Sequence, residues 1–101
     1  IMKVQIQSLH FHAREDLKQF VQSKLSKLEH YSDKLQHAEV YLKIDETNPK
    51  ANKVAEVALY LPGPVLFSQA ESPRFETALN SVYQQLTKQL IKRKEKLSKH
   101  R

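Results

Sequence analysis

The feature that most constrains the fold is a change in hydrophobic period along the chain. Residues 2–7 and 38–45 alternate apolar and polar side chains, and residues 53–61 and 65–71 are predicted as two further strands, with Ala55, Val57, Leu59 and Leu61 and then Leu66, Ser68 and Ala70 on the inward face. A period of two is typical of a strand with one buried face. Residues 14–31 instead carry apolar side chains at helical spacing, and a second helical pattern follows Pro73. The predicted order is β-α-β-β-β-α, an α+β fold.

One-sided strands predict a four-stranded sheet with a single covered face, so both helices should pack on that face. Pro62 and Pro64 flank the only glycine, Gly63, and predict a tight connection between the third and fourth strands. Ser72 is the predicted N-cap of the last helix, with Pro73 at its first position. The uncovered face is expected to display Tyr41, Lys43, Glu56, Tyr60, Val65 and Phe67.

Length and composition exclude several classes of function. The chain has 101 residues, of which 40% are apolar. This is enough for one hydrophobic core, so residues 2–101 are expected to form one domain. The absence of cysteine excludes disulfides, thiolate zinc sites and a cysteine nucleophile. One glycine cannot supply a glycine-rich phosphate loop. No apolar run approaches the roughly 20 residues of a membrane span, and no signal-peptide pattern is present. We therefore expect a cytoplasmic protein without a membrane segment.

The sequence predicts neither an enzyme nor a metal centre. His10 and His12 could present two imidazoles on one side of an extended segment. However, His30, His37 and His100 show no metal-ligand spacing relative to them. No nucleophile elbow or other catalytic motif is found. We therefore assign no catalytic residue, no metal ligand and no cofactor.

Charge is distributed very unevenly along the chain. Residues 1–87 hold ten basic and ten acidic side chains, so the whole formal charge of +6 lies in residues 88–101. These residues carry Lys88, Lys92, Arg93, Lys94, Lys96, Lys99 and Arg101 against Glu95. A cationic end on a neutral body attracts polyanions, either a nucleic acid or an anionic membrane. The last helix has no aromatic anchor beside its lysines, which disfavours the membrane.

The last helix separates its charges from its apolar side chains. At about 100° per residue, one stripe consists of Phe75, Leu79, Val82, Leu86 and Leu90, and a separate flank of Lys88, Lys92, Lys96 and Lys99. Neighbouring lysines repel one another unless an anion binds. Arg93 falls on the line of the apolar stripe, so core packing should end near Leu90 and the remaining turns should project into solvent. The alternative is a solvated helix end, because each cation there gains about 0.3–1 kcal/mol from the helix dipole.

The first helix adds Lys24 and Lys27 to the candidate binding residues. Lys24 lies within the apolar stripe and must extend its ammonium group towards solvent. It could reach a phosphate beside the cationic end, or its stem could simply cover Phe20 and Leu28. The uncovered sheet face has three readings: a platform for stacking RNA bases, a contact for a protein partner, or an ordinary exposed face.

Two strings resemble those of a known family. Residues 24–31, KLSKLEHY, resemble the basic-hydrophobic-x-Lys-Leu-acid-x-aromatic string of the ribosome hibernation factors, also called the sigma-54 modulation protein group. Residues 86–97, LTKQLIKRKEKL, are similar to the Leu-x-basic-Gln-Leu-x-Lys-x-Lys ending of that family. The resemblance covers nearly the whole chain. Long members add a C-terminal domain and the ribosome-associated inhibitor adds an acidic tail, so this chain looks like a short member.

The resemblance implies a fold like that of double-stranded-RNA-binding domains. It also implies a protein that docks on the small ribosomal subunit between head and body, blocks mRNA and tRNA binding and inhibits translation in idle cells. The free protein is expected to be monomeric. Carried over by position, the rRNA contacts would be Lys24, Lys27, Lys88, Lys92, Lys94 and Lys96, to which the charge pattern adds Arg93 and Lys99. The family often has Asp-Met-Tyr where this chain has residues 74–76, Arg-Phe-Glu, so contacts of that triplet are not carried over.

Two other functions fit the same residues. The chain could be a general binder of double-stranded RNA, with equal affinity for a plain duplex and for the subunit. It could also be a protein-interaction module that uses the uncovered sheet face, in which case it would self-associate or bind a partner through Tyr60 and Phe67. No small-molecule substrate is expected under any of these hypotheses.

Overall fold

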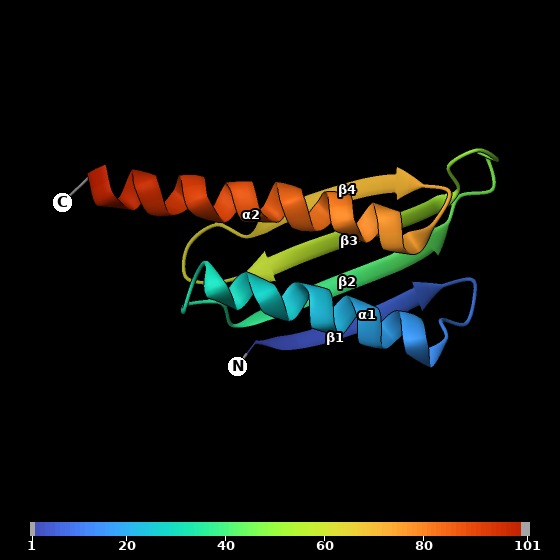
Figure 1. Ribbon diagram of the computed structural model, residues 1–101, viewed down its shortest axis with the longest axis horizontal. Coiled ribbons are helices and arrows are strands. Elements are labelled where there is room, and N and C mark those ends of the chain that lie inside the picture. Colours follow the sequence, from blue (N-terminus) through green and yellow to red (C-terminus); the bar gives the residue numbers. More distant parts are fainter. Residues whose placement is uncertain (1, 100–101) are drawn as a thin grey trace.

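The predicted order of elements is confirmed (Figure 1). The computed structural model describes the backbone of residues 2–99 and the side chains of residues 2–97. Its elements are β1 (Lys3–Leu9), α1 (Glu15–Ser26), the 3-10 turn η1 (Lys27–His30), β2 (His37–Ile44), β3 (Lys53–Tyr60), β4 (Leu66–Ser72) and α2 (Phe75–Lys99). No helix in the described part of the chain is long and apolar enough to cross a membrane.

The four strands form one mixed sheet in the order β1-β2-β3-β4. β1 pairs parallel to β2, with Ile6 opposite Val40, and the remaining neighbours are antiparallel. A parallel pair needs a crossover connection, which α1 provides. Both helices lie on the same face of the sheet and run in the same direction, as Figure 1 shows. The other face is left uncovered, as predicted.

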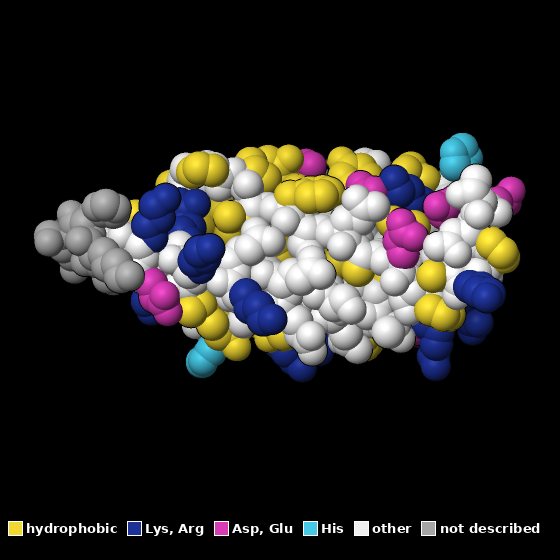
Figure 2. Space-filling model, turned by 90° about the horizontal axis from the view of Figure 1, so that it is seen from above, with side chains coloured by type: hydrophobic (Ala, Val, Ile, Leu, Met, Phe, Trp, Pro, Cys, Tyr) yellow, Lys and Arg dark blue, Asp and Glu magenta, His cyan; other side chains and the backbone are white. Residues whose placement is uncertain are grey.

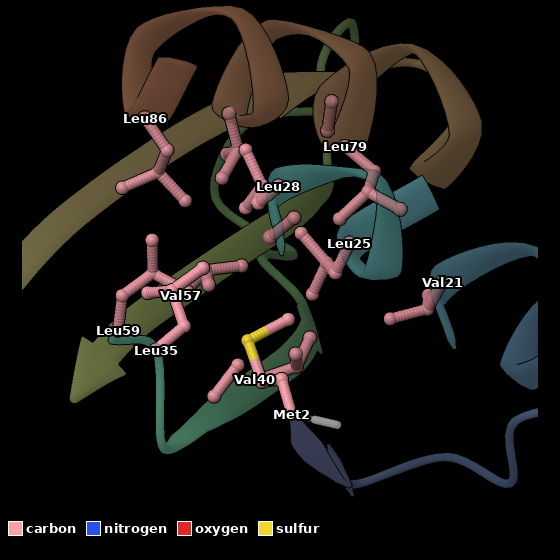
Figure 3. Packing of buried hydrophobic residues seen from close by; sticks show 14 of the residues in the cluster. Met2, Val21, Leu25, Leu28, Leu35, Val40, Val57, Leu59, Leu79 and Leu86 are labelled. Atoms are coloured by element: carbon pink, nitrogen blue, oxygen red, sulfur yellow. The ribbon is translucent and has the colours of Figure 1, made fainter. Parts of the chain in front are cut away.

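The core lies between this helical layer and the sheet. Leu25 and Leu28, from α1 and η1, meet Val57 of β3 and Leu79 and Leu86 of α2 (Figure 3). All five side chains are at most 1% exposed. Full burial of such a side chain contributes about 1.5–3 kcal/mol, so this layer fixes where both helices lie. The apolar stripe predicted for the last helix is buried along its whole length, from Phe75 to Leu90.

The first helix is shorter than predicted. The hydrophobic pattern predicted one helix over residues 14–31, but α1 ends at Ser26 and a 3-10 turn continues to His30. The backbone N–H of Tyr31 donates to the carbonyl of Leu28 at 2.9 Å, which closes that turn. A spacing of three residues fits an α-helix and a 3-10 turn equally well, so the apolar pattern alone could not separate them.

The predicted start of the last helix is also wrong. Ser72 is not an N-cap, because it is still paired with Lys53 in the sheet. The helix begins at Phe75, and the carbonyl of Arg74 accepts the first intrahelical bond, from Ala78 N–H at 3.1 Å. Pro73 therefore lies in the turn before the helix and not at its first position. Strand pairing took precedence over the local capping preference of Ser72.

Candidate nucleic-acid interface

Core packing ends where the sequence predicted. Leu90 is 2% exposed, whereas Ile91 and Leu97 are 43% and 61% exposed. Between Ile91 and Leu97, Arg93 is half-buried and every other side chain is exposed. The last turns of α2 thus project beyond the core. Figure 2 shows Lys and Arg side chains at this end of the molecule, and another group at the opposite end beside acidic side chains.

The lysines of α2 lie on two sides of the helix. Lys88, Lys92 and Lys96 are exposed and share one flank, which we call the outer lysine row. Lys94 lies about 160° around the helix from the middle of that row. It lines a groove between α2 and residues 29–34. The outer lysine row has no ion pair with an acidic side chain among the described residues. The side chain of Lys99 lies outside the described part.

Lys24 contacts the buried first half of α2. Its ammonium nitrogen lies 4.7 Å from the centre of the Tyr83 ring, a cation–π contact between α1 and α2. Tyr83 precedes Lys94 by eleven residues, about 16 Å along the helix axis. Lys27 is exposed at the start of η1. The structure therefore places these two lysines on the α1 side of α2, apart from the outer lysine row.

Arg93 differs from the lysines around it. Its Nη1 donates to the carbonyl of Pro64 at 3.4 Å, and its Nη2 donates to the carbonyl of Pro62. The guanidinium is therefore bound within the protein, to the connection between β3 and β4. The sequence placed Arg93 on the line of the apolar stripe but gave no sign of this partner, because the contact joins residues about 30 positions apart.

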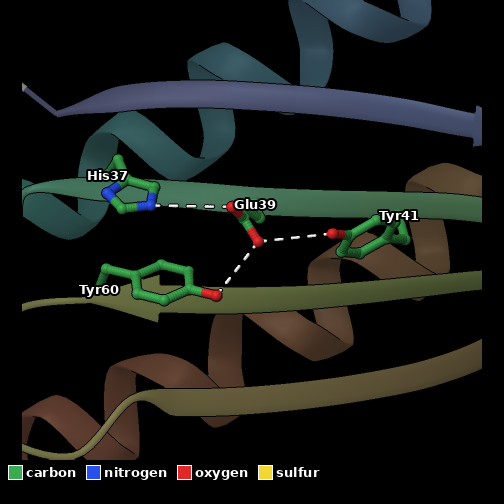
Figure 4. Close-up of polar contacts among 4 residues, drawn as sticks. All are labelled: His37, Glu39, Tyr41 and Tyr60. Atoms are coloured by element: carbon green, nitrogen blue, oxygen red, sulfur yellow. Dashed lines mark hydrogen bonds and ion pairs between the residues drawn. The ribbon is translucent and has the colours of Figure 1, made fainter.

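The uncovered sheet face centres on a carboxylate. Glu39 Oε2 accepts hydrogen bonds from the hydroxyls of Tyr60 at 3.1 Å and Tyr41 at 3.4 Å (Figure 4). His37 Nε2 lies 3.9 Å from Glu39 Oε1, and its ring stacks on Tyr60 with centroids 4.2 Å apart. The hydrogen bond to Glu39, together with partial burial, raises the pKa of Tyr60. One side of the Tyr60 ring is therefore covered by His37, and the carboxylate of Glu39 beside it would repel a phosphate group.

The rest of this face combines an ion pair with exposed apolar side chains. Lys43 Nζ lies 2.5 Å from Glu56 Oε2. Val65 and Phe67 are 48% and 51% exposed at the β4 side. The six side chains predicted for this face are thus half-buried or exposed. Its acids make it a poorer surface for RNA than the end of α2.

The histidines considered as metal ligands give no metal site in the described part of the chain. Within the described residues, no group of three His, Asp or Glu side chains is close enough to hold a metal ion. His10 stands in a left-handed backbone conformation with φ of 67°.

Residues 4–98 match the family model described as "Sigma 54 modulation protein / S30EA ribosomal protein". The chain belongs to this family. The family recognised from residues 24–31 and 86–97 is thereby confirmed. It is a family of ribosome hibernation factors and not of enzymes.

Two relatives with curated names match most of the chain. The ribosome hibernation promoting factor of Escherichia coli (strain K12) is 29% identical over 99 residues, covering 98% of this chain and 100% of that protein. The ribosome hibernation promoting factor of Pseudomonas putida KT2440 is 30% identical over 95 residues, covering 94% and 89%.

Two solved structures share the fold. A ribosomal subunit interface protein from Coxiella burnetii superposes with a TM-score of 0.82 at 22% identity, over 93% of this chain and 99% of that one. The N-terminal domain of Thermus thermophilus Protein Y gives 0.72 at 22% identity, over 88% and 93%. The predicted α+β class, with two helices on one face of a four-stranded sheet, is confirmed.

Proposed function

We propose that this protein is a ribosome hibernation factor whose residues 2–101 act as one ribosome-binding domain on the small subunit. It occupies the decoding region, keeps mRNA and tRNA from binding there and inhibits translation in the cytoplasm of idle cells. Family membership supports ribosome binding. The observation that carries the choice of surface is the outer lysine row, three exposed cations on one flank of α2, of which Lys92 and Lys96 lie beyond the last core residue, Leu90.

The proposed mechanism is occlusion driven by electrostatic binding. The ammonium groups of Lys88, Lys92 and Lys96 displace counterions from rRNA phosphates, and Lys94 and Lys99 extend the contact around the same helix end. Lys24 and Lys27 contribute from the α1 side. If about five phosphates are engaged, the logarithm of the affinity should fall with the logarithm of the salt concentration with a slope of about −4. The protein needs no cofactor for this role.

The test is an affinity measurement with purified small subunits at several salt concentrations. The variant is Lys88→Gln/Lys92→Gln/Lys96→Gln. The matched control, Lys3→Gln/Lys18→Gln/Lys50→Gln, removes the same charge from the neutral body of the protein. We expect the variant to bind about 100-fold more weakly, with a slope less steep by about 2–3. The control should stay within about threefold of wild type, since distant charges are screened.

Three outcomes would contradict the proposal. If wild type fails to bind subunits at near-physiological salt, ribosome binding is wrong. If the control weakens binding as much as the variant, net charge and not this helix end is responsible. If wild type binds a plain RNA duplex as tightly as the subunit, the protein is a general duplex binder. Release of bound protein by mRNA and tRNA added together tests the occlusion step.

A further inference from the structure

Three polar side chains fasten α2 to the β4 edge of the sheet and to the connection before it. Gln85 Oε1 accepts from the hydroxyl of Ser68, and Gln89 Nε2 donates to the carbonyl of Phe67 at 3.0 Å. Arg93 continues this row at the same four-residue spacing and reaches the carbonyls of Pro62 and Pro64. Each later residue of this row on α2 contacts an earlier residue of the chain: first Ser68 and Phe67 in β4, then Pro64 and Pro62 in the connection before it. Among the described residues, Arg93 is thus the last side chain of this row that hydrogen-bonds α2 to another part of the chain.

The absence of a side chain at Gly63 leaves space for the Arg93 guanidinium. Its φ of +99° is a conformation that L side chains rarely adopt, and the Arg93 guanidinium lies directly over it. A Cβ atom at residue 63 would stand 2.7 Å from Nη2 and 3.4 Å from Nη1. No side chain larger than hydrogen fits beneath the guanidinium in this position. The two prolines on either side hold the carbonyls that it binds.

We propose that Arg93 is a positioning residue for the RNA-binding end of α2 and not itself a phosphate contact. This inference rests on the proposed function and reassigns one of the residues that the charge pattern predicted. Leu90 is the last side chain held by the core. Arg93 lies one turn further on, where it fixes the direction of the projecting turns and so presents Lys92 and Lys96 together.

The chemistry of the guanidinium suits this task. A guanidinium carries five N–H donors in a rigid plane, so it can bridge two carbonyls that belong to one turn. An ammonium group has the same charge and three donors, but they diverge from a single nitrogen and lack the rigid fork that presents two separate nitrogens to two carbonyls. If Arg93 acted by charge alone, lysine would replace it. If it acts by bridging Pro62 and Pro64, lysine should fail.

The decisive comparison uses the same charge-preserving substitution at two arginines, Arg93→Lys and the control Arg14→Lys. Each variant is measured for affinity to small subunits and for backbone hydrogen exchange of the free protein. We expect Arg93→Lys to bind about five- to tenfold more weakly. Exchange at residues 94–97 should be faster, because those turns lose their anchor. Arg14→Lys should match wild type in both measurements, since its side chain is exposed, far along the sequence from α2, and makes only a solvent-exposed ion pair with Asp16 at 3.9 Å.

A second variant reaches the same contact without touching any charge. Gly63→Ala places a methyl group against the guanidinium and should also speed exchange at residues 94–97. Combined with Arg93→Lys, it should add little at those residues, because both substitutions break one contact. Additive effects would show that Gly63 and Arg93 act separately.

Wild-type affinity of Arg93→Lys overturns the inference. So does weak binding with unchanged exchange, because that pattern describes a guanidinium that touches RNA directly. The exchange measurement needs no ribosome. If wild type fails to bind subunits, the proposed function is refuted. The hydrogen-exchange comparison of the free proteins still shows whether Arg93 anchors α2.

Discussion

The two halves of α2 are held by different forces. From Phe75 to Leu90 the helix is positioned by apolar side chains, of which Val82 and Leu86 are fully buried. From Ile91 onwards the described side chains are exposed, and the one half-buried residue, Arg93, is held by carbonyls of a turn. The first half supplies stability and direction, and the second half supplies most of the charge, with Lys88 just before the boundary. Stability and binding should therefore be separable by substitution along a single helix.

The largest effect should come from the first half. Leu86→Ala removes a side chain with no exposed area and leaves a cavity beneath the helix. We expect a loss of about 2–5 kcal/mol in the free energy of unfolding, measured by urea denaturation. The matched substitution in the second half, Leu97→Ala, should change it by less than about 0.5 kcal/mol, since that side chain is 61% exposed. Similar losses at both positions would refute the division of α2.

A single lysine of the second half should show the opposite behaviour. Lys92→Gln is expected to weaken subunit binding about five- to tenfold and to lower the salt slope by about 0.7–0.9, the share of one phosphate. Its unfolding free energy should stay at the wild-type value or rise slightly, because repulsion within the outer lysine row is relieved. A destabilised Lys92→Gln protein would mean that this residue has a structural partner.

Removing the contact between Lys24 and Tyr83 tests whether the first half of α2 also contributes to subunit binding. Tyr83→Leu keeps the charge of Lys24 and removes the ring under its ammonium group. We expect a loss of about 0.5–1 kcal/mol in stability and subunit affinity within twofold of wild type. If affinity falls further while stability holds, Tyr83 orients Lys24 towards RNA, and the first half takes part in recognition.

Sequence reasoning located the strands well, because a period of two has few competing explanations. The β2 stretch from Ala38 to Ile44 and the β3 stretch from Lys53 onwards pair as the alternation required. The helix ends were harder to predict. The spacing of Leu25, Leu28 and Tyr31 suits an α-helix or a 3-10 turn, and the chain takes the second after Ser26.

The site was predicted in part for a related physical reason. The positions of charged residues are read directly from the sequence, so the basic end of α2 could be identified from Lys88 onwards. What each cation contacts depends on packing between distant residues. Nothing near Arg93 in the sequence points to Pro62, and nothing near Lys24 points to Tyr83. Only the arrangement in space separates a residue that holds the helix from one that is free to bind.

The smallest expected effect concerns the uncovered sheet face, beyond the reach of either half of α2. Tyr60 holds its proton more tightly in the folded chain, since its pKa is raised above the ordinary value of 10.0 by the hydrogen bond to Glu39. Stability should therefore fall as the pH rises from about 10 through the folded pKa. The raised pKa of Tyr60 should be measurable from phenolate absorbance as a function of pH, after the curve of Tyr60→Phe is subtracted. In Glu39→Gln the pKa of Tyr60 should return towards 10.0.

Subunit binding by Glu39→Gln at neutral pH then decides whether this face matters for recognition. We expect affinity within twofold of wild type, because Lys43, a cation of this face, is already paired with Glu56. Glu39 itself is occupied by the hydroxyls of Tyr41 and Tyr60. A larger loss would place a second binding surface on the sheet, and the projecting half of α2 would then be only part of the interface.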